Sequence, residues 1–469
     1  MLYNKIRGFF ESKWFFVLST ALSALFVVFE KEAIGAIILL NVGALALYFS
    51  ENILVAFLPA LLASTFVIKC YDSATLFMPL WWTALFPVVS IVVYLVTHRR
   101  RFTVGKSFPG VVAVAVAVTL GGLFEIPVKD YFSGASVYYV LALGVGMVAA
   151  YLFVRSHITE NDRYDIFEHF ANMMLAVGVF AAFVVLEYYA VNFETTVLAK
   201  KLAEVQWSNN LSTMLMITMP FALFKMKKSN LYVLALVVQY IAILLVASRG
   251  GWIMGTLEFI ICLAVGIFAM GYKKQLRIIL SVIAVLSIFV AIVLMLKLLN
   301  DQGFLRVGLE KSEARLRLFV RSFEDFWANP IFGSGIGNQA NADIYAGKQG
   351  TMVWYHMMIP QIVGSLGLVG IVCYGKQMWE RFAMIFKKRS AYVWTLGLSY
   401  VGIFLMSQVN PGEFCPLPYE LLTVVNFIMI EKYQEKSGAG SQRFGSFFNF
   451  LKSQKSDFIN ILLVEEFSF

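Results

Sequence analysis

The sequence predicts an all-α polytopic membrane protein with about fourteen transmembrane helices and one large extracytoplasmic loop that contains an amphipathic helix. Hydrophobic residues make up 59% of the 469-residue chain and charged residues only 14%, and the mean hydropathy is +0.75. Apolar runs long enough to cross about 30 Å of hydrocarbon recur from end to end. Because backbone groups in lipid must be satisfied within their own segment, these runs are expected to be helices.

The first apolar run follows a basic N-terminus, and no small-residue cleavage site comes after it, so we expect a retained helix rather than a removed signal peptide. The fourteen expected spans are 14–29, 33–49, 53–68, 74–96, 109–127, 137–154, 169–189, 210–225, 230–247, 251–271, 278–297, 357–375, 391–408 and 416–431.

The distribution of basic residues predicts the orientation of these spans. With the N-terminus inside, most of the 38 Lys and Arg residues fall on the cytoplasmic side, in loops such as 97–106, 225–230, 272–277 and 387–390. This bias is typical of cytoplasmic loops. The C-terminus is then cytoplasmic as well, and His356 is the one histidine on the outer side.

We expect a single transmembrane domain over 1–431, with an external loop at 298–356. The tail 432–469 has clustered Phe with interspersed Lys; an interfacial amphipathic helix and a poorly ordered tail are both open interpretations. The four cysteines have no CxxC spacing, which indicates neither a metal site nor a redox motif. Cys70 and Cys415 fall on the same side, where a disulfide between them could form.

Arginine stands out in the external turn "SRGG" (248–251) between two apolar spans. Gly250 and Gly251 allow a tight turn and close backbone approach. Arg249 could anchor to lipid phosphate from such a turn, or it could bind an anion inside a cavity.

The external loop contains a second candidate. Residues 313–328, with Ser312 as the expected N-cap, predict an amphipathic helix whose apolar face lies along the outer membrane surface or packs on the bundle. Arg315 borders that face, where it can reach an anion beneath the helix. The segment "GSGIGN" (333–338) is expected to be a flexible turn, and it lacks the Lys-Ser/Thr of a phosphate-binding loop.

His356 lies where this loop meets the next apolar helix, in "VWYHMMIPQIVGSLGLVG" (353–370). A guanidinium binds phosphate oxygens through two hydrogen bonds, and a neutral imidazole can take a proton from a hydroxyl. Together these groups suit transfer onto a sugar hydroxyl with a phosphate leaving group. A structural histidine that caps the helix would give the same pattern, so both interpretations stay open.

Three segments carry a resemblance to a known family. They are "SNNLSTMLMITMP" (208–220), "SRGGW" (248–252), and the loop "ARLRLFVRSFEDFWANPIFGSGIG" followed by "YHMMIPQIVGSLGLVG". Together they resemble the O-antigen ligase and O-antigen polymerase superfamily of bacterial envelope glycosyltransferases. The likeness covers about the middle third of the chain.

The resemblance implies transfer of a glycan from an undecaprenyl pyrophosphate carrier to an acceptor hydroxyl, at the outer face of the bacterial cytoplasmic (inner) membrane. It implies neither a metal nor a cofactor. Arg249 and Arg315 would hold the pyrophosphate and His356 would assist the acceptor. Two positions depart from the pattern: Met357 stands where the family has Asn, and Ser365 where it often has an acid.

Further contacts to donor or acceptor are expected from Asn209, Asn210, Gln361 and Glu187. The last lies near the outer end of its span and could instead be an ion-pair partner. Membrane lipid is an expected partner, with a chain-length regulator or a flippase as further candidates, and no nucleic acid is expected.

Two enzymes and one transporter are consistent with these features. A polymerase adds the glycan to another carrier-linked repeat unit, and fourteen spans favour it slightly. A ligase adds the glycan to a lipid A core or a protein. A lipid-linked glycan flippase should have ionisable or broken spans near mid-membrane, whereas we expect mostly uncharged spans, with Glu187 as the exception.

Overall fold

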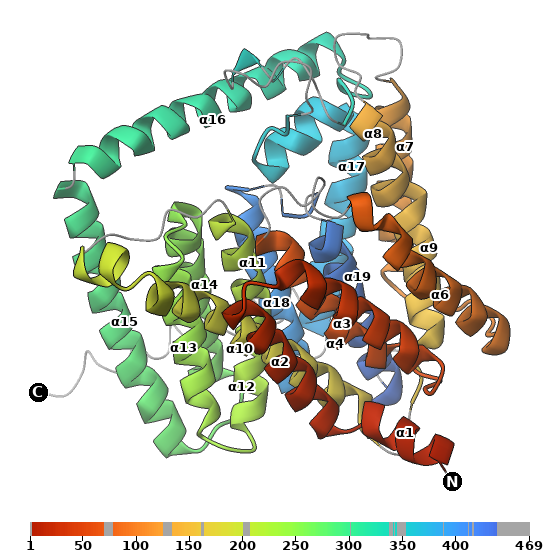
Figure 1. Ribbon diagram of the computed structural model, residues 1–469. Coiled ribbons are helices and arrows are strands. Elements are labelled where there is room, and N and C mark those ends of the chain that lie inside the picture. Colours follow the sequence, from red (N-terminus) through yellow and green to blue (C-terminus); the bar gives the residue numbers. More distant parts are fainter. Residues whose placement is uncertain are drawn as a thin grey trace, which may run out of the picture.

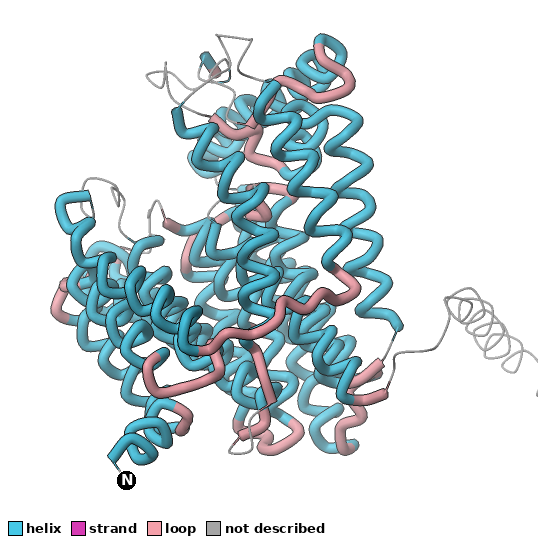
Figure 2. Tube along the Cα trace, turned by 90° about the vertical axis from the view of Figure 1, so that its right-hand side faces the viewer, coloured by secondary structure: helices cyan, strands magenta, loops and turns pink. Residues whose placement is uncertain are grey.

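The structure, a computed structural model, describes residues 2–69, 78–124, 134–160, 164–199, 207–300, 302–336, 341, 343–344, 353–387, 389–410, 412–414 and 417–438. These residues form helices joined by mostly short connections, and no β-strand occurs among them (Figures 1 and 2). The predicted all-α class is confirmed for this part of the chain. Cys70, Cys415 and most of the predicted tail lie outside it.

The first half of the chain contains α1 (Leu2–Phe10), α2 (Lys13–Val28), α3 (Glu32–Leu47), α4 (Leu54–Lys69), η1 (Met78–Ala84), α6 (Leu85–Thr97), α7 (Phe108–Phe124), α8 (Gly134–Leu141), η2 (Ala142–Gly146), α9 (Met147–His157), α10 (Ile166–Val191) and η3 (Glu194–Leu198). The second half contains α11 (Ser208–Thr218), α12 (Pro220–Met226), α13 (Tyr232–Leu245), α14 (Arg249–Phe268), α15 (Lys274–Asn300), α16 (Gln302–Ala328), α17 (Met358–Lys387), α18 (Ala391–Ser407) and α19 (Leu417–Lys436).

Five of the described helical segments are long and apolar enough to cross a membrane: Pro79–Thr97, Ser136–His157, Ile166–Val191, Arg249–Phe268 and Met358–Lys387. The bent pair α1 and α2 would make a sixth if it forms one span. Each of the fourteen predicted spans overlaps at least one helix. Length and composition therefore support several membrane crossings, while fourteen crossings stay a prediction.

The outer surface of the bundle is apolar, as expected of helices that face lipid. On α6, Val88, Val92 and Val96 are each more than half exposed, and on α15 the exposed fractions of Val285 and Phe289 are 68% and 63%. An apolar surface of this extent is unusual on a soluble monomer. The interior contains α11 and α12, and every residue from 211 to 223 is buried.

The largest differences from the expected boundaries concern α16, α17 and α19. Helix α16 begins at Gln302, so Ser312 lies inside it and is not its N-cap. Helix α17 continues to Lys387, twelve residues past the expected end at 375, and α19 continues across the expected domain boundary to Lys436. In Figure 1, α16 crosses the upper end of the molecule above α15, and the N-terminus lies at the opposite end.

Candidate functional site

The turn that carries Arg249 is fixed by its neighbour Ser248. The Ser248 hydroxyl accepts a hydrogen bond from the Gly251 amide at 2.9 Å and donates one to the Asn209 side-chain oxygen at 2.6 Å. Ser248 is therefore the N-cap of α14, whose first residue is Arg249, and such caps favour the start of a helix at that point. This contact joins two of the predicted segments, 208–220 and 248–252.

The two glycines of this turn are needed for close packing, as predicted. A Cβ atom on Gly250 would lie 2.7 Å from the side chain of Val409, and one on Gly251 would collide with the Ser212 hydroxyl. Just before the turn, Ala247 has a φ of +59°, a conformation that is rare for residues other than glycine. Arg249 itself is half-buried.

His356 occupies a second strained turn, with a φ of +57°, and its side chain is half-buried. The amide of the buried Tyr355 donates to the Gln361 side-chain oxygen at 2.9 Å, and the Gln361 amide donates to the Ser365 hydroxyl at 2.7 Å. The Tyr355 hydroxyl bonds to the Asp325 carboxylate of α16. The side chain of Gln361, only 1% exposed, therefore links the backbone of the turn at Tyr355 to the Ser365 hydroxyl in α17.

Helix α17 is broken at Gly367, which has φ +58° and ψ −150°. The glycine-rich segment after Pro330 fits into this break. The backbone amides of Ser334 and Gly335 donate hydrogen bonds to the carbonyls of residues 364 and 365, just before the break. In return, the amides of residues 368 and 369, just after the break, donate to the carbonyls of residues 330 and 331. The described part of this segment, 330–336, is therefore held by the helix, and the expectation of a flexible turn is wrong there.

The connection between α18 and α19 contacts both turns. Val409 packs on Gly250, and the Phe414 ring lies 6.1 Å from that of Trp354. In the first turn of α19, the Tyr419 hydroxyl donates to the Asn210 carbonyl of α11. Trp354 is two residues before His356. The connection therefore contacts Gly250, next to Arg249, and Trp354, two residues before His356.

Arg315 lies on the side of α16 that faces the protein. Leu318, Ser322 and Asp325 form the buried row of this helix, and half-buried Arg315 precedes Leu318 by one turn. The apolar face that the sequence predicts for this helix points away from the protein: the exposed fractions of Leu316 and Val320 are 62% and 50%. The alternative in which this apolar face packs on the bundle is therefore wrong, and a position of the helix along the outer membrane surface stays a prediction.

Glu187 belongs to a different part of the molecule. The charged groups that act on it are Lys69, Glu32 and Glu30, and Lys69 pairs with Glu32 at 2.6 Å. These residues lie at the ends of α3 and α4, so none of these contacts joins Glu187 to the two turns.

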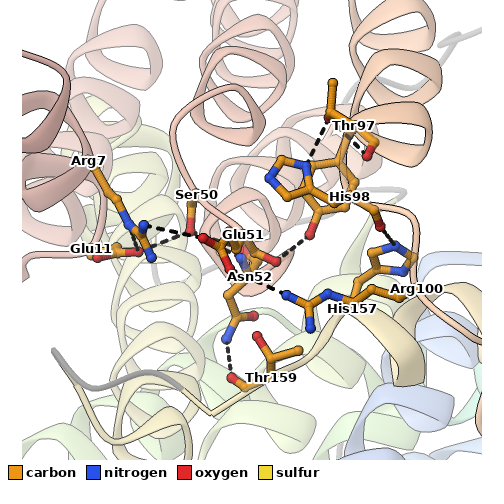
Figure 3. A network of polar contacts seen from close by, with 11 residues as sticks. Arg7, Glu11, Ser50, Glu51, Asn52, Thr97, His98, Arg100, His157 and Thr159 are labelled. Carbon is orange, nitrogen blue, oxygen red and sulfur yellow. Dashed lines mark hydrogen bonds and ion pairs between the residues drawn. The ribbon is translucent and has the colours of Figure 1, made fainter.

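The other three histidines lie among residues from the first half of the chain. His98 and His157 belong to the polar network of Arg7, Glu11, Glu51 and Arg100 shown in Figure 3. His169 lines a cavity that Glu11 also lines. His356 therefore differs from them in its surroundings.

A buried charge cluster was not predicted from the sequence. Arg381 donates to Glu420 at 2.8 Å and to Glu413 at 3.4 Å, and its guanidinium lies over the rings of Tyr400 and Phe427. The prediction placed Arg381 in a cytoplasmic loop because it ended the span at 375. The helix continues past this residue, so the arginine is inside the bundle.

Glu258 is a second ionisable residue within a helix that could cross the membrane. It is fully buried in the middle of α14, and neither carboxylate oxygen has a hydrogen-bond partner in the part of the chain that the structure describes. Its side chain packs against Gly402 of α18. Together with Arg381, this residue contradicts the expectation that Glu187 is the exception among uncharged spans.

Near the predicted site, Arg321 of α16 forms a two-point ion pair with Asp343, at 2.5 and 2.8 Å. The guanidinium lowers the pKa of the Asp343 carboxyl by hydrogen bonding to its charged form.

Among the described residues, no group of three or more His, Cys, Asp or Glu is arranged to hold a metal ion.

Comparison of the chain with protein-family models, with curated proteins and with solved structures gives no match in any of the three. The function is therefore inferred from the residues themselves.

Proposed function

We propose that this protein polymerises undecaprenyl-pyrophosphate-linked oligosaccharide repeat units into a surface polysaccharide at the outer face of the bacterial cytoplasmic membrane. In this proposal the chain crosses the membrane about fourteen times with both termini in the cytoplasm. The two turns that carry Arg249 and His356 then face the periplasmic side. The reaction uses the carrier-linked glycan as its donor.

One observation carries the proposal most directly: two turns with non-glycine residues at positive φ contact the same α18–α19 connection. Ala247 precedes Arg249 by two residues, and His356 is itself in the left-handed conformation. Such strain is concentrated at functional sites, where the surrounding structure maintains it. The turns that carry Arg249 and His356 therefore each contact this connection, and in this proposal the guanidinium and the imidazole act on one substrate.

The chemistry follows from these groups. His356 takes the proton of the acceptor hydroxyl as that oxygen forms a bond to the anomeric carbon of the donor glycan. The bond from this carbon to the pyrophosphate oxygen breaks, and the carrier pyrophosphate leaves with the electron pair. Arg249 and Arg315 stabilise the charge that develops on the leaving group. Gln361 and Tyr355 position the histidine turn.

A ligase would use the same donor chemistry with a lipid A core or protein acceptor. A flippase for lipid-linked glycans is the second class of candidate, and two observations favour it more than the sequence did. Helix α17 is broken at Gly367, and Arg381 and Glu258 lie buried within helices that could cross the membrane. Broken helices and intramembrane charges are common in transporters.

The test is the length of glycan made in cells that carry His356→Ala, Arg249→Ala or Arg315→Ala, with the membrane level of each variant measured. The proposal predicts loss of long polymer, about 100-fold or more for His356→Ala, while single repeat units are still displayed. Accumulation of long carrier-linked polymer without surface attachment would indicate a ligase. Normal glycan in all three variants would refute the catalytic roles.

A further inference from the structure

A polar cavity and an apolar groove adjoin each other between α2 and α10. The cavity has a volume of about 240 Å³, and its lining includes Lys13, Asp165, His169 and Lys228. The groove has a volume of about 470 Å³, and apolar side chains of both helices, such as Ala24 and Phe183, form most of its walls. Phe16 and Asn172 line both spaces, so the cavity and the groove adjoin at these two side chains.

Polar groups without partners lie along this site. His169 is 4% exposed, and its ring lies between those of Phe16 and Tyr164 at 4.6 and 4.2 Å. Among the described residues, neither its Nε2 nor the buried Thr20 hydroxyl in the groove has a hydrogen-bond partner. Buried polar groups in proteins are normally hydrogen-bonded, so an occupant with polar atoms at this depth would satisfy both.

The mouth of the cavity presents charges of both signs. Lys13 and Asp165 are exposed. Lys228 is also exposed, and it pairs with Glu168, which Lys225 contacts from the other side at 2.8 Å. Glu11 is held by Arg7 (Figure 3). An ammonium group can therefore approach Asp165 while a phosphate approaches Lys13.

We propose that this site binds one glycerophospholipid with a zwitterionic, ammonium-bearing headgroup. The headgroup lies in the polar cavity, the ester oxygens of the glycerol region lie near Thr20, Asn172 and His169, and one acyl chain fills the groove. The order of polar, mixed and apolar surfaces along the site matches the order of groups along such a lipid. This proposal does not depend on the glycosyltransferase activity.

The test uses the full-length protein in detergent, depleted of lipid and then exposed to mixed micelles of phosphatidylethanolamine or phosphatidylglycerol. Native mass spectrometry counts the lipids that stay bound. We expect one phosphatidylethanolamine per chain and at least tenfold less phosphatidylglycerol. Asn172→Leu combined with Thr20→Val should reduce retention at least tenfold, whereas the control Val285→Leu, on the exposed face of α15, should not.

Equal retention of both lipids, or equal retention by the double variant and the control, would overturn the proposal, because ordinary annular lipid would explain it. A photoreactive residue at Val17, which lines the groove and is 55% exposed, provides the second measurement. Crosslinking to phospholipid supports the proposal. Crosslinking to a peptide from 439–469 would mean that the chain's own C-terminal segment fills the groove, and would also overturn it.

Discussion

Ser248 donates a 2.6 Å hydrogen bond to Asn209 while it caps the helix that begins with Arg249. The same hydroxyl thus starts α14 and ties this helix to α11. In the proposed site this contact fixes the direction in which the Arg249 side chain leaves the turn.

Ser248→Ala should therefore affect both stability and activity. Loss of an N-cap costs about 1 kcal/mol, and the loss of the Asn209 contact should release the arginine turn and reduce polymer formation. Ser390→Ala is the matched control, because Ser390 caps α18 through a 3.2 Å bond from the Val393 amide. Thermal unfolding and glycan length are the measurements. Equal loss of polymer in both variants would contradict a specific role for Ser248.

Gly367→Ala should destabilise the protein, because a Cβ atom there would lie 2.7 Å from backbone atoms of residues 330, 331 and 333, at a positive φ. Strain of this kind costs about 1–3 kcal/mol, and the collision adds to it. Gly375→Ala in the same helix is the control, since a Cβ atom added at Gly375 would have no neighbour within 4 Å, and it should be neutral or slightly stabilising. The unfolding temperatures of the two variants check this difference.

The break in α17 also shows what the sequence could and could not predict. The apolar runs predicted a helix at each expected span, because this signal depends on local composition. Gly367 lies within the expected span 357–375, for which the sequence predicts a single helix. Only the three-dimensional structure shows that Gly367 interrupts the helix, because the segment that fills the break, 330–335, lies more than 30 residues earlier.

The candidate site and its surroundings likewise contain residues that the sequence could identify and residues that it could not. Arg249, Asn209 and His356 could be selected from local motifs, and the fold brings the turns that carry Arg249 and His356 into contact with the same α18–α19 connection. The partners of Arg381 could not be identified from local motifs, because Glu420 is 39 residues away and no local pattern pairs the two residues. Glu187 looked suitable by its position along a span, yet the fold directs it towards Lys69 and Glu32.

Removal of the Arg381 charge should be strongly destabilising. Arg381→Met leaves the buried carboxylates of Glu413 and Glu420 without their cation, at a cost of about 3–5 kcal/mol. Glu420→Gln should cost less, because Glu413 still faces the guanidinium. The double variant should be more stable than the sum of the single effects by about 1–3 kcal/mol. Strict additivity in unfolding experiments would contradict a direct interaction.

The ion pair between Arg321 and Asp343 predicts a dependence of stability on pH. The pKa of Asp343 is lowered in the folded protein, so its contribution is fully present above the unfolded value of about 3.9 and is lost as the pH falls through the folded value. Because both side chains are partly exposed, the contribution should be about 1 kcal/mol or less. Thermal unfolding between pH 3 and 6 should show a smaller pH dependence for Asp343→Asn than for the wild type. Identical pH profiles for Asp343→Asn and the wild type would show that this ion pair is not the source of the pH dependence.

An in vitro reaction with purified protein examines whether this chain joins carrier-linked glycans. The protein is incubated with undecaprenyl-pyrophosphate-linked repeat units as the only substrate, and product length is measured. We expect a ladder of longer carrier-linked products with the wild type, none with His356→Ala, and an unchanged ladder with the control Gly375→Ala. A wild-type protein that is folded and yet makes no product longer than one repeat unit would contradict the polymerase assignment.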